Sequence, residues 1–161
     1  MTLRELEGSR FGAGGTSEGY DVAWRLKLLK NLSVVVKQLW SVGVSDVFVD
    51  GSFVEDRPHP NDIDGYFTCK LFDLMTGDLE MRLNGIDPYK CWTWDHRARR
   101  RHPDSTKAEL PMWHIYRVDM FPHWQGQPPD GCDQHIPTLF RRQKATDKPK
   151  GIVKLLKEAR L

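Results

Sequence analysis

The sequence predicts a single domain of the α/β type (α+β), in which a mixed β-sheet is flanked by helices. Three observations support this fold class. Residues 22–40 carry apolar side chains at helical spacing, residues 45–53 and 62–69 are short β-branched and aromatic runs on either side of a charged loop, and residues 113–124 form a later run of the same kind. With 161 residues, 39% of them hydrophobic, the chain can bury one core, so one domain is expected.

The chain begins with a glycine-rich segment. Residues 8–19 contain almost no large apolar side chains, so we expect residues 1–19 to form a flexible N-terminus and residues 20–161 to form the domain. A helix is predicted to start after Asp21, which is placed as its N-cap, and to end before Gly43. Its apolar positions recur at helical spacing: Val22, Leu26, Leu29, Val36 and Trp40.

Two strands and a second helix follow. The run "SDVFVDGSF" (45–53) predicts a buried strand that enters a tight turn at Gly51, and "DIDGYFTC" (62–69) predicts the next strand. Residues 71–83 again carry apolar side chains at helical spacing and predict a helix. Gly77 weakens that helix by about 1 kcal/mol relative to alanine.

The segment 87–111 has no regular period and predicts a long loop or an insertion around short helices. It contains the basic run "HRARRRH" (96–102). This run either contacts the phosphate backbone of RNA or DNA, with Trp92 and Trp94 stacking on bases, or is a solvated loop. The solvated loop is the favoured interpretation.

The last part of the chain predicts further strands. "WHIYRVDMFPHW" (113–124) has the composition of a strand, which Pro122 is expected to stop. Two shorter runs, "TLFRRQ" (138–143) and "KGIVKLL" (150–156), predict either a closing pair of strands or a strand and a short helix.

Charge and cysteine usage exclude several classes of protein. Lys and Arg number 24 against 22 Asp and Glu, so the chain as a whole is not expected to bind nucleic acid through bulk phosphate neutralisation. The three cysteines are odd in number and widely spaced, which argues against a disulfide framework and for a reducing, cytoplasmic location. No run approaches the ~20 apolar residues of a membrane-spanning helix, so no membrane association is expected.

Two aspartates one residue apart carry the main chemical prediction. Side chains alternate along a strand, so Asp62 and Asp64 share a face and lie about 6.6 Å apart. Like charges held this close need a compensating cation. Asp119, between Val118 and Met120, would add a third carboxylate from a neighbouring strand. Such carboxylates can hold two divalent ions about 3.5 to 4 Å apart, and their hard oxygens suit Mg²⁺, with Mn²⁺ as a substitute.

A glycine and a serine precede these acids. Gly51 would let the backbone approach a triphosphate closely, and Ser52 would donate its hydroxyl and amide to phosphate oxygens. In the alternative, purely structural interpretation, Gly51 is only a turn residue, Asp62 belongs to a turn and Asp64 forms a surface ion pair with an arginine. Basic residues late in the chain either reach the triphosphate or are ordinary surface charge; the candidates are Arg141, Lys148 and Lys150.

The pattern of these residues resembles a known superfamily. Gly51-Ser52, nine intervening residues and then Asp62-Ile63-Asp64, followed later by Asp119, resemble the polymerase-beta-type nucleotidyltransferases. "VDGSFVEDRPHPNDIDGYF" together with "FRRQKATDKPKGIVKL" is similar to a small, uncharacterised bacterial and phage-associated minimal branch of that superfamily, over roughly residues 21–154. Two positions depart from the usual pattern, because Asp50 and Gly65 stand where apolar residues are common.

The resemblance implies a nucleotidyltransferase-like fold and a division of roles. Asp62 and Asp64 would bind both magnesium ions, Asp119 would complete one shell and orient or deprotonate the acceptor hydroxyl, and the Gly-Ser turn would hold the triphosphate. The expected activity is transfer of a nucleoside monophosphate from an NTP, with ATP as the default donor, to an unknown acceptor hydroxyl on RNA, protein or a small molecule.

Two other functions stay open. The first is a catalytically weak nucleotidyltransferase-like interaction protein, such as a component of a toxin–antitoxin or phage-defence pair with a cognate partner. The second is a nucleic-acid-binding module that uses the basic run 96–102, which has the least support because it rests on one run in a nearly neutral chain.

Overall fold

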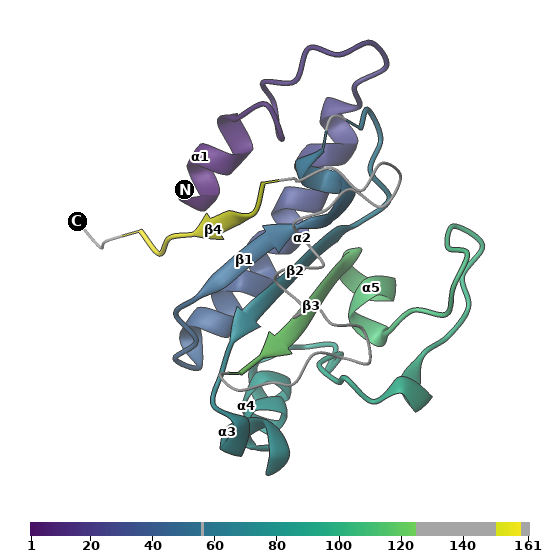
Figure 1. Ribbon diagram of the computed structural model, residues 1–161. Helices are drawn as coiled ribbons and strands as arrows, with labels where there is room; N and C mark the ends of the chain where they lie inside the picture. The colour runs from purple at the N-terminus through teal and green to yellow at the C-terminus, as the bar shows by residue number, and fades with distance from the viewer. Residues whose placement is uncertain (56, 125–150, 159–161) are drawn as a thin grey trace.

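The computed structural model describes residues 1–55, 57–124 and 151–158. Its centre is a four-stranded mixed sheet with the order β3-β2-β1-β4, flanked by helices, which confirms the expected fold class (Figure 1). Strand β1 is antiparallel to both β2 and β4, whereas β2 and β3 are parallel. The strands are β1 Val47–Asp50, β2 Ile63–Thr68, β3 Val118–His123 and β4 Val153–Leu155.

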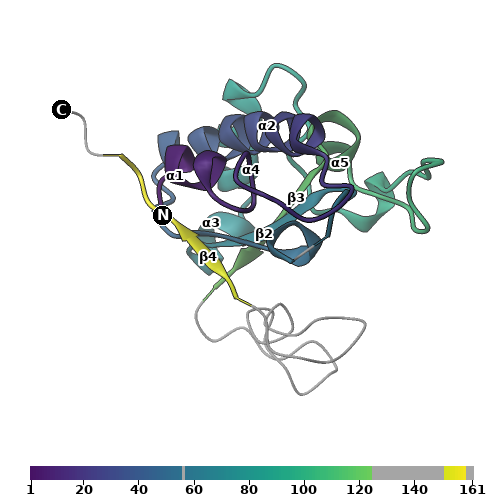
Figure 2. The same cartoon turned by 90° about the horizontal axis from the view of Figure 1, so that it is seen from above.

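The helices gather mainly on one face of this sheet, as the view from above shows (Figure 2). The α-helices are α1 Leu3–Gly8, α2 Val22–Ser41, α3 Leu71–Met75, α4 Asp78–Ile86 and α5 Pro111–Tyr116. Two short 3₁₀ turns are η1 Gly51–Val54 and η2 His96–Ala98. None of the helices in the described part of the chain is both long enough and apolar enough to cross a membrane.

Helix α2 forms the core with the sheet. The prediction of its start is confirmed, because the side chain of Asp21 accepts a hydrogen bond from the amide of Trp24 at 2.9 Å. Its inward face and the inward residues of the strands are fully buried in one cluster, which includes Leu28, Leu32, Val35, Leu39, Val47, Val49, Ile63 and Phe67. Each such side chain contributes about 1.5–3 kcal/mol on burial, so this layer holds the sheet in place.

Helix α1 is not predicted by the sequence. Thr2 and Glu5 form a reciprocal capping box at its start, and Leu6 is completely buried against the core. Because a helix this short is marginal in isolation, packing against α2 accounts for it.

The single helix predicted over residues 71–83 is wrong, because the chain forms two helices there. Gly77 has a φ of 74°, in the left-handed region that glycine adopts at little cost. It ends the turn after α3 and serves as the N-cap of α4. Gly77 therefore divides the predicted helix into two, which is a larger effect than its low helix propensity alone suggests.

The strand predicted over residues 113–124 begins only at Val118. The preceding residues form α5, with Pro111 in its first turn and the left-handed Arg117 (φ 55°) at its end. Pro122 does not stop β3, contrary to expectation. The carbonyl oxygen of His123 faces β2 and accepts from the amide of Cys69 at 2.9 Å. The backbone N–H and C=O groups of successive residues in a strand face opposite neighbours, so those of Pro122 face away from β2. The N–H that proline lacks is therefore not needed for the pairing of β3 with β2, and an edge strand tolerates its absence.

The rest of the chain agrees with the expected outline. Residues 87–110 form the predicted loop around one short turn, η2, with an isolated bridge between Arg100 and Glu109. The run 150–156, expected as a strand or a short helix, contains the strand β4. The run 138–143 lies outside the described residues.

Candidate active site

Three aspartates form a row across adjacent strands at one end of the sheet. Asp50 is the register partner of Asp64 on β1 and β2, and Asp64 is the register partner of Asp119 on β2 and β3. Neighbouring strands lie about 4.8 Å apart, so the three side chains project side by side. Asp62 lies one residue before the start of β2. The structure thus brings Asp62, Asp64 and Asp119 to the same end of the sheet and adds Asp50 to them.

Asp119 is the most buried of the three predicted ligands. It is only 2% exposed, and neither carboxylate oxygen finds a hydrogen-bond donor in the part of the chain that the structure describes. Burial, together with the negative charges of Asp64 and Glu109, raises the pKa of Asp119 to about 7, against the opposing charge of Lys107. A cation beside this carboxylate would remove most of the cost of its ionisation.

Gly51 is required here for a reason that the sequence does not reveal. Its φ is 77°, and a Cβ at this position would lie 2.4 Å from the Oδ2 atom of Asp64. The absence of a side chain therefore makes room for the carboxylate of Asp64 itself, in addition to any ligand. Ser52 follows in the turn η1 and lines the adjacent cavity.

A buried arginine holds this turn against the N-terminal segment. Arg25 of α2 is completely buried, and its Nη1 atom donates to the carbonyl oxygens of Phe11 and Phe53, each at 2.9 Å. Its Nη2 atom donates to the carbonyl oxygen of Arg57. One cation thus ties the glycine-rich segment, the turn η1 and the loop before Asp62 together.

Asp62 is oriented by an aromatic residue that the sequence analysis does not place in the site. The indole Nε1 of Trp113, which is fully buried, donates to Oδ2 of Asp62 at 2.7 Å. The guanidinium of Arg117 stacks on the Trp113 ring at 4.0 Å and donates to Oδ2 of Asp104 at 2.6 Å. Helix α5 therefore fixes the position of the first acid of the Asp-x-Asp pair.

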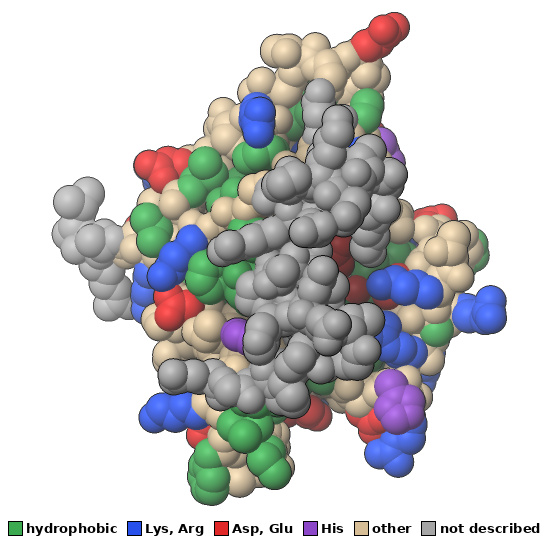
Figure 3. Space-filling view, in the orientation of Figure 1, with side chains coloured by type: hydrophobic (Ala, Val, Ile, Leu, Met, Phe, Trp, Pro, Cys, Tyr) green, Lys and Arg blue, Asp and Glu red, His purple; other side chains and the backbone are tan. Residues whose placement is uncertain are grey.

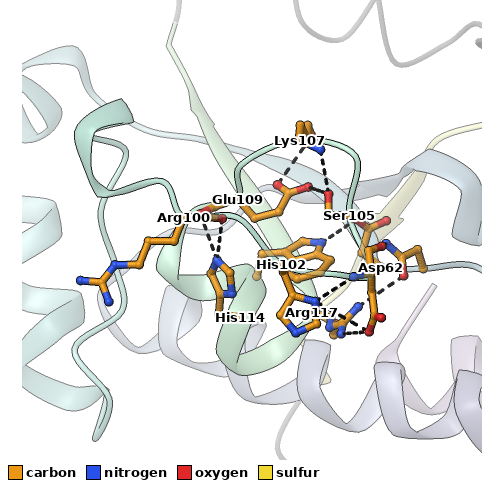
Figure 4. Close-up of polar contacts among 11 residues, drawn as sticks. Asp62, Arg100, His102, Ser105, Lys107, Glu109, His114 and Arg117 are labelled. Atoms are coloured by element: carbon orange, nitrogen blue, oxygen red, sulfur yellow. Dashed lines mark hydrogen bonds and ion pairs between the residues drawn. The ribbon is translucent and has the colours of Figure 1, made fainter.

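The loop between Asp104 and Glu109 closes the site from the other side (Figure 4). Glu109 is 1% exposed, and its Oε1 atom accepts from the hydroxyl of Ser105 at 2.7 Å. Its Oε2 atom lies 3.7 Å from Nζ of Lys107 and 3.9 Å from a guanidinium nitrogen of Arg99. This arrangement adds a third buried carboxylate, after Asp50 and Asp119, and a lysine to the neighbourhood of Asp119.

A cavity of about 300 Å³ opens between these groups. In the space-filling view, acidic side chains are visible in a hollow beside Lys and Arg side chains at this end of the sheet (Figure 3). Five carboxylates line the cavity against two cations, Arg57 and Lys107, so it is electrostatically suited to cations. Its residues are Gly51, Ser52, Glu55, Arg57, Asn61, Asp62, Asp64, Asp104, Ser105, Thr106, Lys107 and Glu109.

Sequence comparison assigns a family. The model of DUF6932, a family of unknown function, matches residues 1–156. The chain belongs to this family. No curated protein and no solved structure matches it.

Several residues of the DUF6932 chain in this cavity are missed by sequence reasoning. Arg57 lies between the Gly51-Ser52 turn and the Asp62–Asp64 pair, and this position is the only feature of the sequence that suggests a place for it in the site. The segment that follows the basic run has a polar residue at every second position: Ser105, Lys107 and Glu109. Their arrangement in space depends on the backbone bridge between Arg100 and Glu109. The local sequence does not indicate which other segment of the chain these side chains contact.

The DUF6932 chain does not carry a preformed metal cluster in the residues that the structure describes. No group of three or more His, Cys, Asp and Glu side chains there is arranged so that it could hold a metal ion. The donor set still fits magnesium chemically, because its members are hard carboxylate oxygens and both oxygens of Asp119 are buried without a donor. Magnesium commonly takes the rest of its shell from water and substrate phosphates.

The sequence also predicts contacts of basic residues with the triphosphate and of two tryptophans with bases. Arg141, Lys148 and Lys150, the basic candidates for the triphosphate, lie outside the described residues. Trp92 is not available for stacking on bases, and Trp94 is half-buried. Trp92 is fully buried and donates to Oε1 of Gln38 at 2.6 Å, and Trp94 donates to the carbonyl oxygen of Met120 at 2.8 Å.

The basic run 96–102 is partly neutralised within the chain. Arg97 pairs with Asp95 at 2.8 Å, and Arg99 lies against Glu109 and donates to the carbonyl oxygen of Ala108 at 3.1 Å. Arg100 forms the backbone bridge that positions Glu109. These contacts favour a structural part for the run beside the cavity.

Proposed function

We propose that this DUF6932 chain is a magnesium-dependent nucleotidyltransferase that transfers a nucleoside monophosphate from an NTP, with ATP as the default donor, to an acceptor hydroxyl. The observation that carries the proposal is the register pairing of Asp64 with Asp119, beside Asp62 and the turn at Gly51. The acceptor, on RNA, protein or a small molecule, is left open.

Asp62, Asp64 and Asp119 would hold the magnesium ions together with the phosphates of the nucleotide. Bound there, the ions supply charge neutralisation on the triphosphate and on the attacking oxygen. Manganese would substitute for magnesium, since both prefer oxygen ligands.

The chain's own residues then position the reactants. Ser52 and the cations Arg57 and Lys107 line the cavity and would contact phosphate oxygens. A cavity of about 300 Å³ is at the small end for a ligand site, so it would hold the triphosphate while the base lies outside. Glu109 keeps Lys107 in place through their ion pair at 3.7 Å.

The reaction balances without a further reactant. The acceptor oxygen forms a bond to the α-phosphorus as the bond from that phosphorus to the bridging oxygen breaks, and pyrophosphate leaves. The proton of the acceptor hydroxyl would pass to a carboxylate, and Asp119 is the proposed acceptor of that proton.

Incubation of the protein with each α-phosphate-labelled NTP, Mg²⁺ or Mn²⁺ and a cell lysate tests the proposal. Label should enter a macromolecular or small-molecule acceptor, and Asp62→Asn and Asp64→Asn should abolish transfer. Asp73→Asn, on α3 away from the cavity, is the matched control and should leave transfer unchanged. Absence of transfer under all conditions, with no uptake of Mg²⁺ and nucleotide by calorimetry, would refute the proposal.

A second candidate is a catalytically weak interaction protein with the same fold, for example a component of a toxin–antitoxin or phage-defence pair. The observation that favours it is that no metal cluster is preformed in the described residues, while Asp62 is already bonded to Trp113. This candidate predicts tight co-purification of a cognate polypeptide that survives Asp62→Asn, without nucleotide turnover.

A further inference from the structure

A second concave surface lies far from the acid row, between α1, α2 and the residues that follow β4. Helix α1 lies beside α2 (Figure 2), and the cavity between them and the chain end measures about 840 Å³. We call it the α1–α2 groove. It is lined by Leu3, Arg4, Glu7, Leu26, Lys27, Leu29, Lys30, Ser33, Lys37, Trp40, Lys157 and Glu158.

The floor of the α1–α2 groove is apolar and elongated. Leu26, Leu29 and Trp40 of α2 form it together with Leu3 of α1, while Ser33 keeps its middle open with a small side chain. From Leu26 to Trp40 the groove follows α2 for about 21 Å, at 1.5 Å per residue. This length matches a partner helix of about four turns.

The rim of the groove is strongly basic. Its lining holds five cations and two carboxylates, a net charge of +3, whereas the whole chain carries only +2. Arg4, Lys30, Lys37 and Lys157 form no ion pair with any residue that the structure describes, and their side chains are exposed. Within the described residues, four unpaired positive charges therefore lie along this apolar floor.

Trp40 lies at one end of the floor. Its indole N–H is buried and has no acceptor in the described part of the chain. Because that N–H is closed to solvent, a ligand in the groove would meet the ring of Trp40 rather than its N–H.

We propose that the α1–α2 groove binds an acidic amphipathic helix of a partner protein. Its apolar side chains, spaced i, i+4, i+7 and i+11, would lie on the floor, and flanking Asp and Glu side chains would meet Lys27, Lys30 and Lys37 on one wall and Arg4 and Lys157 on the other. A nucleic-acid backbone would use the cations but not the apolar floor. A lipid surface would meet the outer rim but not a concave floor.

Fluorescence anisotropy of the full chain with labelled synthetic peptides tests this. The probe is a peptide of about 14 residues with leucine at the four floor positions and glutamate beside them, long enough to span about 21 Å as a helix. A scramble of the same composition and a version with lysine in place of glutamate are the peptide controls. The acidic amphipathic peptide should bind at least about tenfold more tightly than either control, and more weakly at high salt.

Charge reversal of the groove supplies the protein control. Lys30→Glu combined with Lys37→Glu should weaken peptide binding by about tenfold or more, and Lys70→Glu, an exposed lysine outside the groove, should not. Trp40→Phe, which replaces the indole with a smaller ring, should weaken binding by a smaller factor. Circular dichroism melting identifies any variant that has lost its fold, and hydrogen exchange in α1 and α2 should slow when the peptide binds.

Three results would overturn the proposal. The first is binding of the scramble as tightly as the designed peptide. The second is unchanged peptide affinity in the folded Lys30→Glu, Lys37→Glu variant. The third is binding of a single-stranded oligouridylate, or of phosphatidylcholine vesicles containing phosphatidylserine, that depends on these lysines while the peptide does not bind.

Discussion

Asp64 and Asp119 are register partners on the parallel strands β2 and β3, and Gly51 on the other side of Asp64 leaves its carboxylate only just enough space. Two acids are thus held side by side at the end of the sheet, and Asp119 is buried. Folding alone does not benefit from this arrangement, because it separates Asp119 from water and places it near other negative charges. A site built at the cost of stability is a common property of functional centres.

Removal of the buried charge should therefore stabilise the protein. The pKa of Asp119 rises from 3.8 to about 7 in the folded chain, so between these pH values the folded state holds a proton that the unfolded state has released. Stability should fall as pH rises through this window. Asp119→Asn should abolish that fall and stabilise the protein at pH above 7 by as much as about 4 kcal/mol.

Urea unfolding at a series of pH values measures this effect. Glu18→Gln, at an exposed position in the N-terminal segment, is the control and should keep the pH dependence of the unsubstituted protein. An Asp119→Asn variant with the same slope between pH 4 and 7 would show that Asp119 is already ionised in the folded chain.

Gly51→Ala should disturb both the turn and Asp64. The new Cβ would lie 2.4 Å from Oδ2 of Asp64, and the φ of 77° is unfavourable for alanine. We expect a loss of about 1–3 kcal/mol in unfolding free energy and loss of nucleotide and Mg²⁺ binding by calorimetry. Gly85→Ala is the matched control: it lies in α4 with no atom within 4 Å of the new Cβ, so it should stabilise the protein by about 0.5–1 kcal/mol.

Asp87, which lies outside the site, should contribute strongly to the free energy of unfolding. It is buried and accepts hydrogen bonds from the hydroxyl of Tyr116 at 2.7 Å, the amide of Cys91 at 2.9 Å and the side chain of Gln38 at 3.1 Å. Asp87→Ala leaves three donors without an acceptor and should cost about 3 kcal/mol or more, measured by urea unfolding. Nucleotide binding by the folded variant should be retained.

The ionisation of Asp87 predicts the opposite pH trend from Asp119. Burial raises the pKa of Asp87, but the hydrogen bonds from Cys91 and Tyr116 outweigh it and leave the pKa below the usual 3.8. The stabilisation is therefore present above about pH 4 and is lost as pH falls below that value. Asp87→Asn should have a smaller loss of stability on acidification than the unsubstituted protein.

Lys107→Ala tests the contacts of the loop that closes the cavity. If the protein transfers nucleotides, loss of a cation that contacts phosphate should raise KM for the NTP by about tenfold, with a smaller effect on kcat. Lys107 also lowers the pKa of Asp119, so its removal should shift the acidic limb of the pH–rate profile, which reports Asp119 as the proton acceptor, toward higher pH. Lys70→Ala should change neither quantity.

Much of the fold follows from local patterns in the chain. The apolar period and the capping Asp21 define α2, and β-branched and aromatic runs define β1 and β2. Local patterns fail where neighbouring structure decides, as at Pro122, which is accepted because β3 lies at the sheet edge. They also miss α1, which is too short to be stable without the surface of α2.

For the candidate site, the sequence by itself determined that Asp64 lies on a strand, that Asp62 stands two residues before it and that a glycine turn precedes both, because strand and turn preferences act over a few residues. Only the tertiary structure decided that Asp119 is the register partner of Asp64, that Trp113 orients Asp62, and that Lys107 and Glu109 approach from a distant loop. Strand order and loop placement depend on which apolar faces can be buried together, which is a property of the whole chain rather than of any segment.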